Sequence, residues 1–394
     1  NDTVEEQQTN HVVYLDHNAT TPIHREVKEA MIEFMECYGN PSSIYSMGKE
    51  ARDAIEAARR SVAALINCTA RRITFTGGGS EANNLAIKGI AFANANRRNH
   101  IVTTSIEHPS VLNTCRWLEK QGFSVTYLPV DTEGIVNPYD LEAAVTDKTC
   151  LVSVMLANNE TGAIQPIIEL KGIAKERGAL FHTDAVQAAG KIAIDIEELG
   201  VDLLTMSAHK FYGPKGVGAL YVRKGTVLDP LVSGGHQEKG LRAGTENVMA
   251  IVGLGKAAEH AIDHIPQMDN IRELRDKLEN GIKELITDAK LNGPREQRLP
   301  NTCNLTMPGI RGESLVLVLD QKGIAVSSGS ACSAGLPEPS HALMAMGLSE
   351  EEAHCAVRFT LGLDNTIDEI DHTILYINRV IRERKDMIRF VSCR

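Results

Sequence analysis

Short apolar, β-branched runs alternate with amphipathic stretches of helical period along the first part of this chain. The apolar runs read RRITFT, HIVTTS, SVTYLP, CLVSVML, ALFHTD, VDLLTMS and GALYVR. Helical patterns such as SEANNLAIKGIAFA and IIELKGIAKERG separate several of them. Strands that alternate with helices in this way form a mainly parallel sheet with helices on its faces, so we expect an α/β fold.

The alternation is broken before about residue 265, and this change predicts a second, smaller domain. The helical patterns AIVGLGKAAEHAID and NIRELRDKLENGIKELI are followed by NTCNLTM, ESLVLVLDQKG, AVRFTL and a closing helix over about 368–384. A chain of 394 residues also exceeds what one hydrophobic core normally supports. We therefore expect a large domain over 24–264 and a small α+β domain over 265–394, with the segment 1–23 packing against the small domain.

Charge and hydropathy exclude several classes of function. The formal net charge is −10, from 51 acidic and 41 basic residues, and nonspecific DNA or anionic-membrane binding needs a positive field. The polar start NDTVEEQQTN does not resemble a signal peptide, and no apolar run is long enough to span a membrane. These features predict a cytoplasmic protein without DNA or membrane partners. Because the chain begins with Asn1 instead of methionine, processing and an organellar location stay open.

The eight cysteines contain no CxxC pair, which favours reduced thiols over a zinc site or a disulfide framework. No metal site is expected. Cys332 differs from an ordinary buried cysteine, because it lies in the stretch VSSGSACSAG among small, flexible residues. The pattern therefore predicts that the loop over about 326–336 presents a thiol, although a cysteine that merely fills a gap in a turn would give the same local pattern.

Polar residues follow three of the expected strands, at the sheet edge where α/β proteins bind ligands. A glycine turn and Ser80 follow ITFT, Asp184 ends ALFHTD, and Ser207, His209 and Lys210 end VDLLTMSAHK. A glycine-rich turn before a helix can hold a phosphate, yet alone it also fits a structural turn, and an aspartate near a lysine also fits a salt bridge. Together they suit pyridoxal phosphate, which needs a lysine, an aspartate and a phosphate cradle.

Nine separated stretches, spread over most of the chain, resemble motifs of one known family. They are YLDHNATTP, GGGSEANNLAIKG, IEHPSVLNTC, ANNETGAIQPI, HTDAVQAAGK, SAHKFYGPKGVGALYVR, RAGTENV, SSGSACSAG and AVRFTLG. In this order, from about residue 13 to about 380, they resemble the class I cysteine desulfurases, the NifS/IscS-like branch of the fold-type I pyridoxal-phosphate enzymes. The resemblance implies an aspartate aminotransferase-like architecture.

The resemblance also implies roles around the cofactor ring. Lys210 would carry pyridoxal phosphate covalently and shuttle a proton, His108 would stack on the ring, and Asp184 would pair with the ring nitrogen. Asn159 and Gln187 would hydrogen-bond the phenolic oxygen. From the residues alone, His108 also fits a structural helix start, and Asn159 also fits a turn cap.

Further roles follow from the resemblance for the phosphate. Gly79, Ser80, Ser207 and His209 would hold it within one subunit of a homodimer, and Thr245 would reach the phosphate of the partner subunit. Each of these residues is unremarkable when taken singly.

Two residues would act on the substrate L-cysteine. Arg358 would bind its carboxylate, together with Asn159, because the planar guanidinium can make two parallel hydrogen bonds; alone it also fits a surface strand residue. Cys332 would take the sulfur as a persulfide, leave L-alanine, and pass the sulfur to an iron–sulfur scaffold or another acceptor protein.

Three alternatives stay open at this point. A selenocysteine lyase would use the same cofactor residues without depending on Cys332. A fold-type I aminotransferase would share Lys210 and Asp184 but have no use for the loop. A non-catalytic scaffold that binds iron–sulfur assembly factors would not need Lys210.

Overall fold

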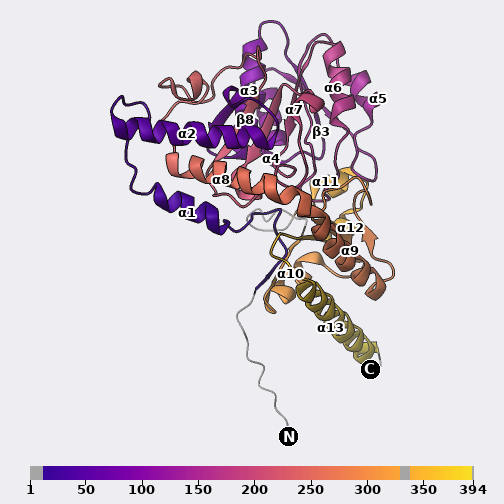
Figure 1. The fold of residues 1–394 in the computed structure, drawn as a ribbon. Helices are drawn as coiled ribbons and strands as arrows, with labels where there is room; N and C mark the ends of the chain where they lie inside the picture. Colours follow the sequence, from indigo (N-terminus) through magenta and orange to yellow (C-terminus); the bar gives the residue numbers. More distant parts are fainter. Residues whose placement is uncertain (1–11, 329–337, 393–394) are drawn as a thin grey trace.

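The computed structural model describes residues 12–328 and 338–392 (Figure 1). Cys332 and most of the loop expected over 326–336 lie outside the described residues. Within these ranges the chain forms a sheet of seven strands, a sheet of four strands, a sheet of two strands and the helices that pack against them.

The large sheet has seven strands and is mainly parallel, as the alternating sequence pattern predicts. In spatial order its strands are β2 (Ile73–Thr76), β8 (Gly218–Val222), β7 (Leu203–Ser207), β6 (Leu180–Asp184), β5 (Thr149–Ser153), β3 (His100–Thr104) and β4 (Ser124–Leu128). Only β8 runs antiparallel to its two neighbours within this sheet. The predicted α/β class is confirmed.

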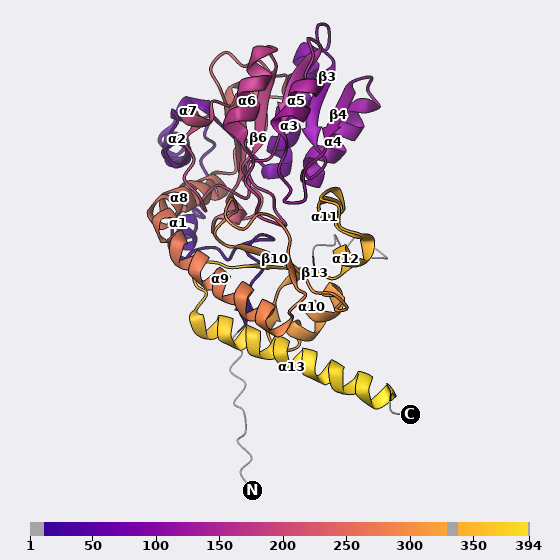
Figure 2. The ribbon, with the colours of Figure 1, turned by 90° about the vertical axis from the view of Figure 1, so that its right-hand side faces the viewer.

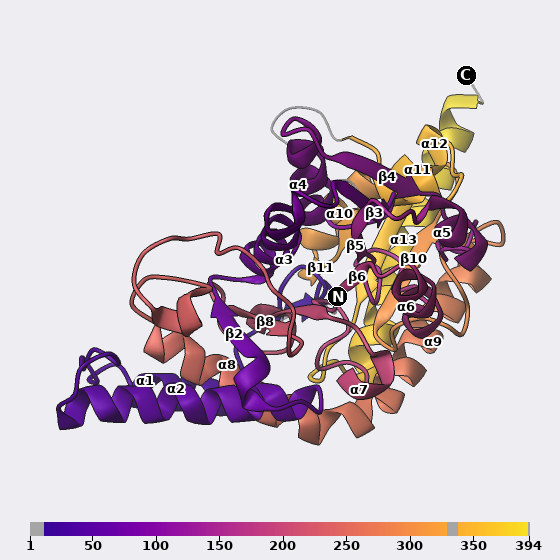
Figure 3. The same ribbon diagram turned by 90° about the horizontal axis from the view of Figure 1, so that it is seen from above.

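Helices cover both faces of this sheet, because alternate residues of a buried strand point to opposite sides. Leu151 and Leu203 belong to the core beneath α3 (Gly79–Asn94) and α4 (Pro109–Glu119). The neighbouring residues Val152 and Leu204 belong to the core of the other face. That core also takes in α1 (Arg25–Glu33), α2 (Ser46–Leu65), α5 (Pro138–Ala144), α6 (Ile167–Glu176), α7 (Ile196–Leu199) and α8 (Val248–His264). Figure 3 shows α2 and α8 across the strands from α3.

A second core lies under the small antiparallel sheet. Its strands are, in spatial order, β12 (Ser327–Ser328), β13 (Ala356–Thr360), β10 (Thr302–Thr306) and β9 (Lys290–Leu291). The helices that supply its apolar residues are α9 (Met268–Leu285), α10 (Gly312–Asp320) and α13 (Ile367–Ser392). Figure 2 shows these helices below the large sheet, with α11 (His341–Ala345) and α12 (Glu350–His354) between the two parts. The closing helix α13 continues past the expected end at 384.

The N-terminal segment joins the second core and then crosses to the large sheet. β1 (Val13–Tyr14) pairs in parallel with β11 (Ile324–Ala325), and Val13 and Leu15 are buried in the second core. Two residues of the following turn reach different parts of the protein, since Asp16 bridges to Thr360 and the Thr21 N–H donates to the His209 carbonyl. The turn therefore lies between the two cores. The short 3₁₀ helices are η1 (Ala70–Arg72), η2 (Ala208–Lys210), η3 (Gln237–Gly240) and η4 (Ile265–Gln267).

Candidate active site

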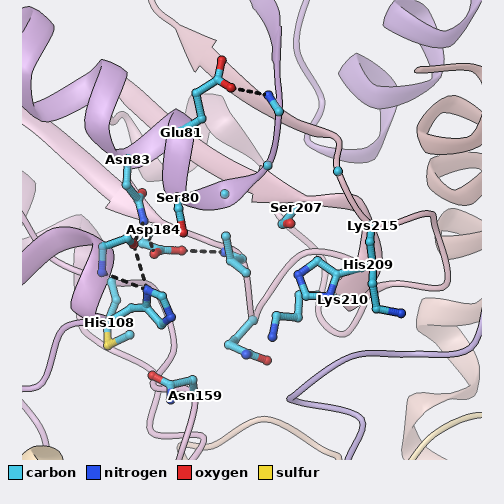
Figure 4. A pocket seen from close by; sticks show the side chains of 18 residues that line it. Ser80, Glu81, Asn83, His108, Asn159, Asp184, Ser207, His209, Lys210 and Lys215 are labelled. Carbon is cyan, nitrogen blue, oxygen red and sulfur yellow. Dashed lines mark hydrogen bonds between the residues drawn. The ribbon is translucent and has the colours of Figure 1, made fainter. Parts of the chain in front are cut away.

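A cavity of about 570 Å³ lies where β2, β6 and β7 end and α3 and α4 begin (Figure 4). Its lining residues are Gly77, Gly78, Gly79, Ser80, Glu81, Asn83, His108, Ser110, Met155, Asn159, Asp184, Val186, Gln187, Ser207, His209, Lys210, Lys215 and Gly216. The structure thus brings together most of the residues that the sequence singled out, from five separate stretches of the chain. Thr245 and Arg358 are not among the lining residues.

The N-terminus of α3 forms one wall of this cavity. Its N-cap is Gly78, whose φ of 149° suits glycine, and no side chain of the described residues accepts a capping hydrogen bond there. A Cβ at Gly79 would lie 2.9 Å from Val186 Cγ2 and 3.3 Å from Ser207 Cβ. The glycines therefore keep the backbone close to Ser207 and leave the positive end of the helix dipole facing the cavity, which favours an anion.

Lys210 extends into the cavity from η2, directly after β7 (Figure 4). Its Nζ donates to the backbone carbonyls of Asn18 at 2.5 Å and Ala19 at 2.7 Å. Burial, assisted by the nearby positive charge of Arg358, lowers the pKa of Lys210 to about 8. A larger share of this amine is neutral near neutral pH than for an ordinary lysine, and neutral amines are the nucleophilic form.

Asp184 faces the cavity from the end of β6 and is held by fixed donors. One carboxylate oxygen accepts from Asn83 Nδ2 at 2.7 Å and the other from the Val186 N–H at 2.9 Å. Asn83 Nδ2 also donates to Ser110 Oγ at 2.9 Å, and Ser110 Oγ lies 2.8 Å from His108 Nδ1. This chain of contacts fixes the carboxylate and the imidazole relative to each other, although Asp184 and His108 are 76 residues apart in sequence.

His108 is the N-cap of α4, and its ring is exposed to the cavity. Nδ1 accepts from the Ser110 N–H at 3.1 Å. Partial desolvation by the cavity wall lowers the pKa of His108, with nearby Lys210 and His341 acting in the same direction and Asp184 opposing them. The capping role and the cavity-facing ring are compatible, so the structural interpretation of His108 does not exclude a role at the site.

Arg358 lies on β13 and reaches Asn159 from the small sheet. Nη1 donates to the Asn159 carbonyl at 3.0 Å, and Nη2 forms an ion pair with Asp16 at 2.8 Å. Nε is buried without a hydrogen-bond partner in the described part of the chain. Only 8% of the residue is exposed, so the alternative of a surface strand residue is wrong. The contact with Asn159 instead holds the guanidinium next to the cavity, and its Nε–H remains as a donor for a ligand.

Residues 13–373 match the family described as aminotransferase class-V. The protein named cysteine desulfurase IscS from Dictyoglomus turgidum is 52% identical over 373 residues, which cover 94% of this chain and 95% of that protein. The chain belongs to the cysteine desulfurase family. This membership confirms the resemblance inferred from the nine stretches and the fold-type I architecture that it implied.

Two solved structures support the cysteine desulfurase fold. A NifS-like protein is 41% identical, with a TM-score of 0.89 over 94% of this chain and 100% of the other. The structure titled "SspA in complex with cysteine" is 38% identical, with a TM-score of 0.77 over 89% of this chain and 98% of the other. The likeness thus extends over nearly all of each chain and includes both parts of the fold.

The remaining predicted residues occupy different surroundings. Ser80, Ser207 and His209 line the cavity, and His209 Nδ1 lies 3.2 Å from Thr20 Oγ1. Burial and neighbouring lysines lower the pKa of His209 to about 4, so the ring is neutral at neutral pH. Thr245 is exposed in the loop before α8, away from the cavity of its own chain.

Sequence analysis missed several residues that connect the parts of the chain around this cavity. Asn18 is buried, and its side chain donates to the Asn159 carbonyl and to Thr302 Oγ1. Lys191 is buried as well and donates to Asn18 Oδ1. Both residues occur inside the quoted stretches YLDHNATTP and HTDAVQAAGK, but no local pattern marks them, because their partners are far away in sequence.

The described residues contain no group of three or more histidine, cysteine, aspartate or glutamate side chains placed to hold a metal ion. In the same part of the chain, no helix is both long and apolar enough to cross a membrane. Every cysteine described there is a free thiol.

The lowered pKa of Lys210 makes a testable statement about pH. An amine reacts with an aldehyde when it has lost its proton, so the reaction of Lys210 with an added aldehyde, for which pyridoxal phosphate serves as the probe, should speed up as pH rises through about 8 and then level off. The rate is measured in stopped flow, from the visible absorbance that appears when the aldehyde is added to the protein. A rate that keeps rising toward the pKa of an exposed lysine, about 10.4, would contradict the argument.

Proposed function

We propose that this protein is a pyridoxal-phosphate-dependent cysteine desulfurase that converts L-cysteine to L-alanine and transfers the sulfur to Cys332 as a persulfide. The observation that carries the proposal is the convergence of the Lys210 amine, the Asp184 carboxylate and the open N-terminus of α3 on one cavity. Family membership supports it, since relatives of this length and similarity are named cysteine desulfurases.

The residues around the cavity fit the cofactor. The close approach at Gly79 and the uncapped helix end suit its phosphate, with Ser80, Ser207 and His209 beside them. Asp184 is held by Asn83 and by a backbone N–H, so a fixed carboxylate is available for the ring nitrogen. A cavity of about 570 Å³ is large enough for a cofactor with an amino acid attached.

Bound pyridoxal phosphate supplies an electron sink for the carbon atoms of the substrate. Lys210 would then serve as the base that takes the Cα proton, a role that suits a partly neutral, partly buried amine. Asp184 would keep a proton on the ring nitrogen, His108 would lie against the ring, and Asn159 and Gln187 would bind its phenolic oxygen. Each of these five side chains lines the cavity.

Arg358 binds the carboxylate of L-cysteine in this proposal, and this role gives a prediction. Replacing it with lysine keeps the charge but removes the planar pair of donors, so the KM for L-cysteine should rise about 10- to 100-fold. Steady-state kinetics of alanine formation measure the change. Arg223→Lys is the matched control, because Arg223 also pairs with an aspartate beside a strand but lies outside the cavity. An unchanged KM in Arg358→Lys would rule out this assignment.

Cys332 completes the reaction in the proposal. Its thiolate attacks the sulfur of the substrate, so an S–S bond forms and the Cβ–S bond breaks. The electron pair of the broken bond stays with Cβ, which gains a proton and becomes the methyl group of L-alanine. The net change is L-cysteine plus a thiol giving L-alanine plus a persulfide, with atoms and electrons balanced.

The described chain on both sides of the cysteine supports this assignment. Ser327, five residues before Cys332, is the β12 partner of Arg358. Ser340, eight residues after it, donates to Glu160 Oε2 at 2.5 Å, and Glu160 is the neighbour of Asn159. Both flanks are therefore anchored at residues beside the cavity, and a chain spans up to about 3.3–3.6 Å per residue.

The proposal includes a homodimer and an acceptor protein for the persulfide, for instance an iron–sulfur scaffold. Thr245 is exposed and does not line the cavity of its own chain, as expected for a residue that completes the site of a second copy. Large apolar side chains, among them Ile44 and Tyr38, are also strongly exposed in the single subunit, as expected for a chain that pairs with a second copy. Free thiols throughout the described residues favour a reducing compartment such as the cytoplasm.

Product analysis tests the proposed function directly. The purified protein is loaded with pyridoxal phosphate and given L-cysteine with a thiol reductant, and both L-alanine and sulfide are quantified. One sulfide released per alanine is the expected result. Formation of pyruvate or a keto acid without alanine would exclude a desulfurase and favour an aminotransferase or another reaction on the same cofactor.

A further inference from the structure

A buried lysine that the proposed reaction does not use lies directly behind the cavity. Lys191 is 6% exposed, and its Nζ donates to Gln187 Oε1 at 2.9 Å and to Asn18 Oδ1 at 2.8 Å. No carboxylate of the described residues lies within ion-pair distance of it. Burial, together with the positive charges of Lys210 and Arg358, holds the pKa of Lys191 well below its ordinary value. The burial of this amine therefore has to be explained by something other than a salt bridge.

The two acceptors of Lys191 are both amide oxygens, and this fixes how each amide is turned. Asn18 Oδ1 accepts from Lys191 and from Asn301 Nδ2, so its Nδ2 faces the Asn159 carbonyl and Thr302 Oγ1. All four hydrogen-bonding positions of the Asn18 side chain are thereby used. Rotating this amide by 180° would set its nitrogen against the donors that now face its oxygen.

Gln187 is fixed in the same way at both ends of its amide. Its Oε1 accepts from Lys191, and its Nε2 donates to the Asn18 carbonyl at 3.0 Å. The Asn18 carbonyl also accepts from Lys210 Nζ. The amide nitrogen of Gln187 and the amine of Lys210 therefore share one acceptor, and an N–H of Gln187 remains for a ligand in the cavity that it lines.

We propose that Lys191 is a positioning residue: its amine holds the oxygen of Gln187 and thereby turns a Gln187 N–H toward the phenolic oxygen of bound pyridoxal phosphate. This inference rests on the proposed function, because it concerns the cofactor that Lys210 carries. Without Lys191, Gln187 Oε1 would be buried without a donor, and the amide would have to move to find one.

The test measures the visible absorption of the bound cofactor as a function of pH, and not the rate of turnover. A hydrogen bond donated to the phenolic oxygen stabilises its anionic form, so losing it raises the pH midpoint of the visible absorption change of the bound cofactor. Lys191→Met has a similar length without a donor. We expect its midpoint to rise by about one pH unit, and the dissociation constant for pyridoxal phosphate to increase about tenfold. Lys191→Gln, which retains one amide donor, should give a smaller rise and serves if the methionine variant does not fold.

A double-mutant cycle with Gln187→Ala separates positioning from general structural support. If Lys191 acts through Gln187, Lys191→Met adds no further shift of the midpoint in the Gln187→Ala background. A partly buried lysine on α6, outside the cavity, supplies the control Lys171→Met, whose midpoint should match that of the unmodified protein. An unchanged midpoint in Lys191→Met and Lys191→Gln, or an equal shift in both backgrounds, would overturn the inference alone. Failure of the unmodified protein to bind pyridoxal phosphate would overturn the proposed function, and this inference with it.

Discussion

Lys210→Ala should lower L-alanine formation from L-cysteine by about 10⁴-fold or more, because in the proposed mechanism this one residue supplies both the covalent attachment of the cofactor and the base. In the structure Lys210 Nζ is the amine that faces Asp184 across the cavity, and its pKa of about 8 suits proton transfer near neutral pH. The variant should also lack the visible absorption of a covalently held cofactor. Product analysis and an absorption spectrum of the purified protein measure the two effects.

The matched control for this prediction is Lys224→Ala. Lys224 is exposed just after β8 and does not line the cavity, so both the spectrum and the rate should stay as they are. Alanine formation by Lys210→Ala at more than about a hundredth of the normal rate would mean that another group is the base.

Cys332→Ser should lower alanine formation from L-cysteine by about 100-fold or more while leaving cofactor binding intact. A serine hydroxyl stays protonated at neutral pH and is a far weaker nucleophile than a thiolate, so the sulfur acceptor of the proposed reaction would be missing. The rate is measured as alanine formed in the absence of added thiol. Bound cofactor is measured from the absorption spectrum, which separates loss of the acceptor from loss of the site.

Cys37→Ser is the control, because Cys37 is a free, partly exposed cysteine that does not line the cavity. It should leave the rate unchanged. Full activity of Cys332→Ser on L-cysteine would contradict the proposed sulfur transfer. A variant that lost its activity on cysteine and kept activity on selenocysteine would argue against the selenocysteine lyase alternative, because that enzyme would not depend on Cys332.

The large sheet could be predicted from sequence because most of its strands are buried on both faces. Strands such as β5 and β7 read as continuous apolar runs, and helices of regular period separate several of them. The antiparallel direction of β8 could not be predicted, since the run GALYVR is mainly apolar, like the runs that form the parallel strands. Strand direction is decided by the connection and the partner, which local patterns do not contain.

The site was predictable where the chemistry sits at strand ends. Asp184 and Lys210 end or follow buried strands, so their convergence on one edge follows from the parallel arrangement. The residues that support them were not predictable. Asp16 meets Arg358 across 342 positions of sequence, and Asn18 meets Lys191 across 173. Such pairs exist only once the N-terminal turn lies between the two cores.

Buried polar residues were the second feature that could not be predicted from the sequence. Lys191 reads in sequence as an ordinary surface lysine after Gly190, because lysine is rarely buried. In the structure Gly190 has a φ of 76°, and a Cβ there would lie 2.5 Å from Phe211 Cβ. This turn directs Lys191 inward to Gln187 and Asn18, a direction that only the folded backbone reveals.

Mass spectrometry of the peptide that contains Cys332 tests the central claim most directly. The protein with bound cofactor is exposed briefly to L-cysteine, alkylated and digested, and the same is done with Lys210→Ala. Sulfur transfer as proposed predicts one additional sulfur atom on Cys332 in the unmodified protein and none in the variant. Formation of L-alanine with an unmodified Cys332 peptide would contradict it.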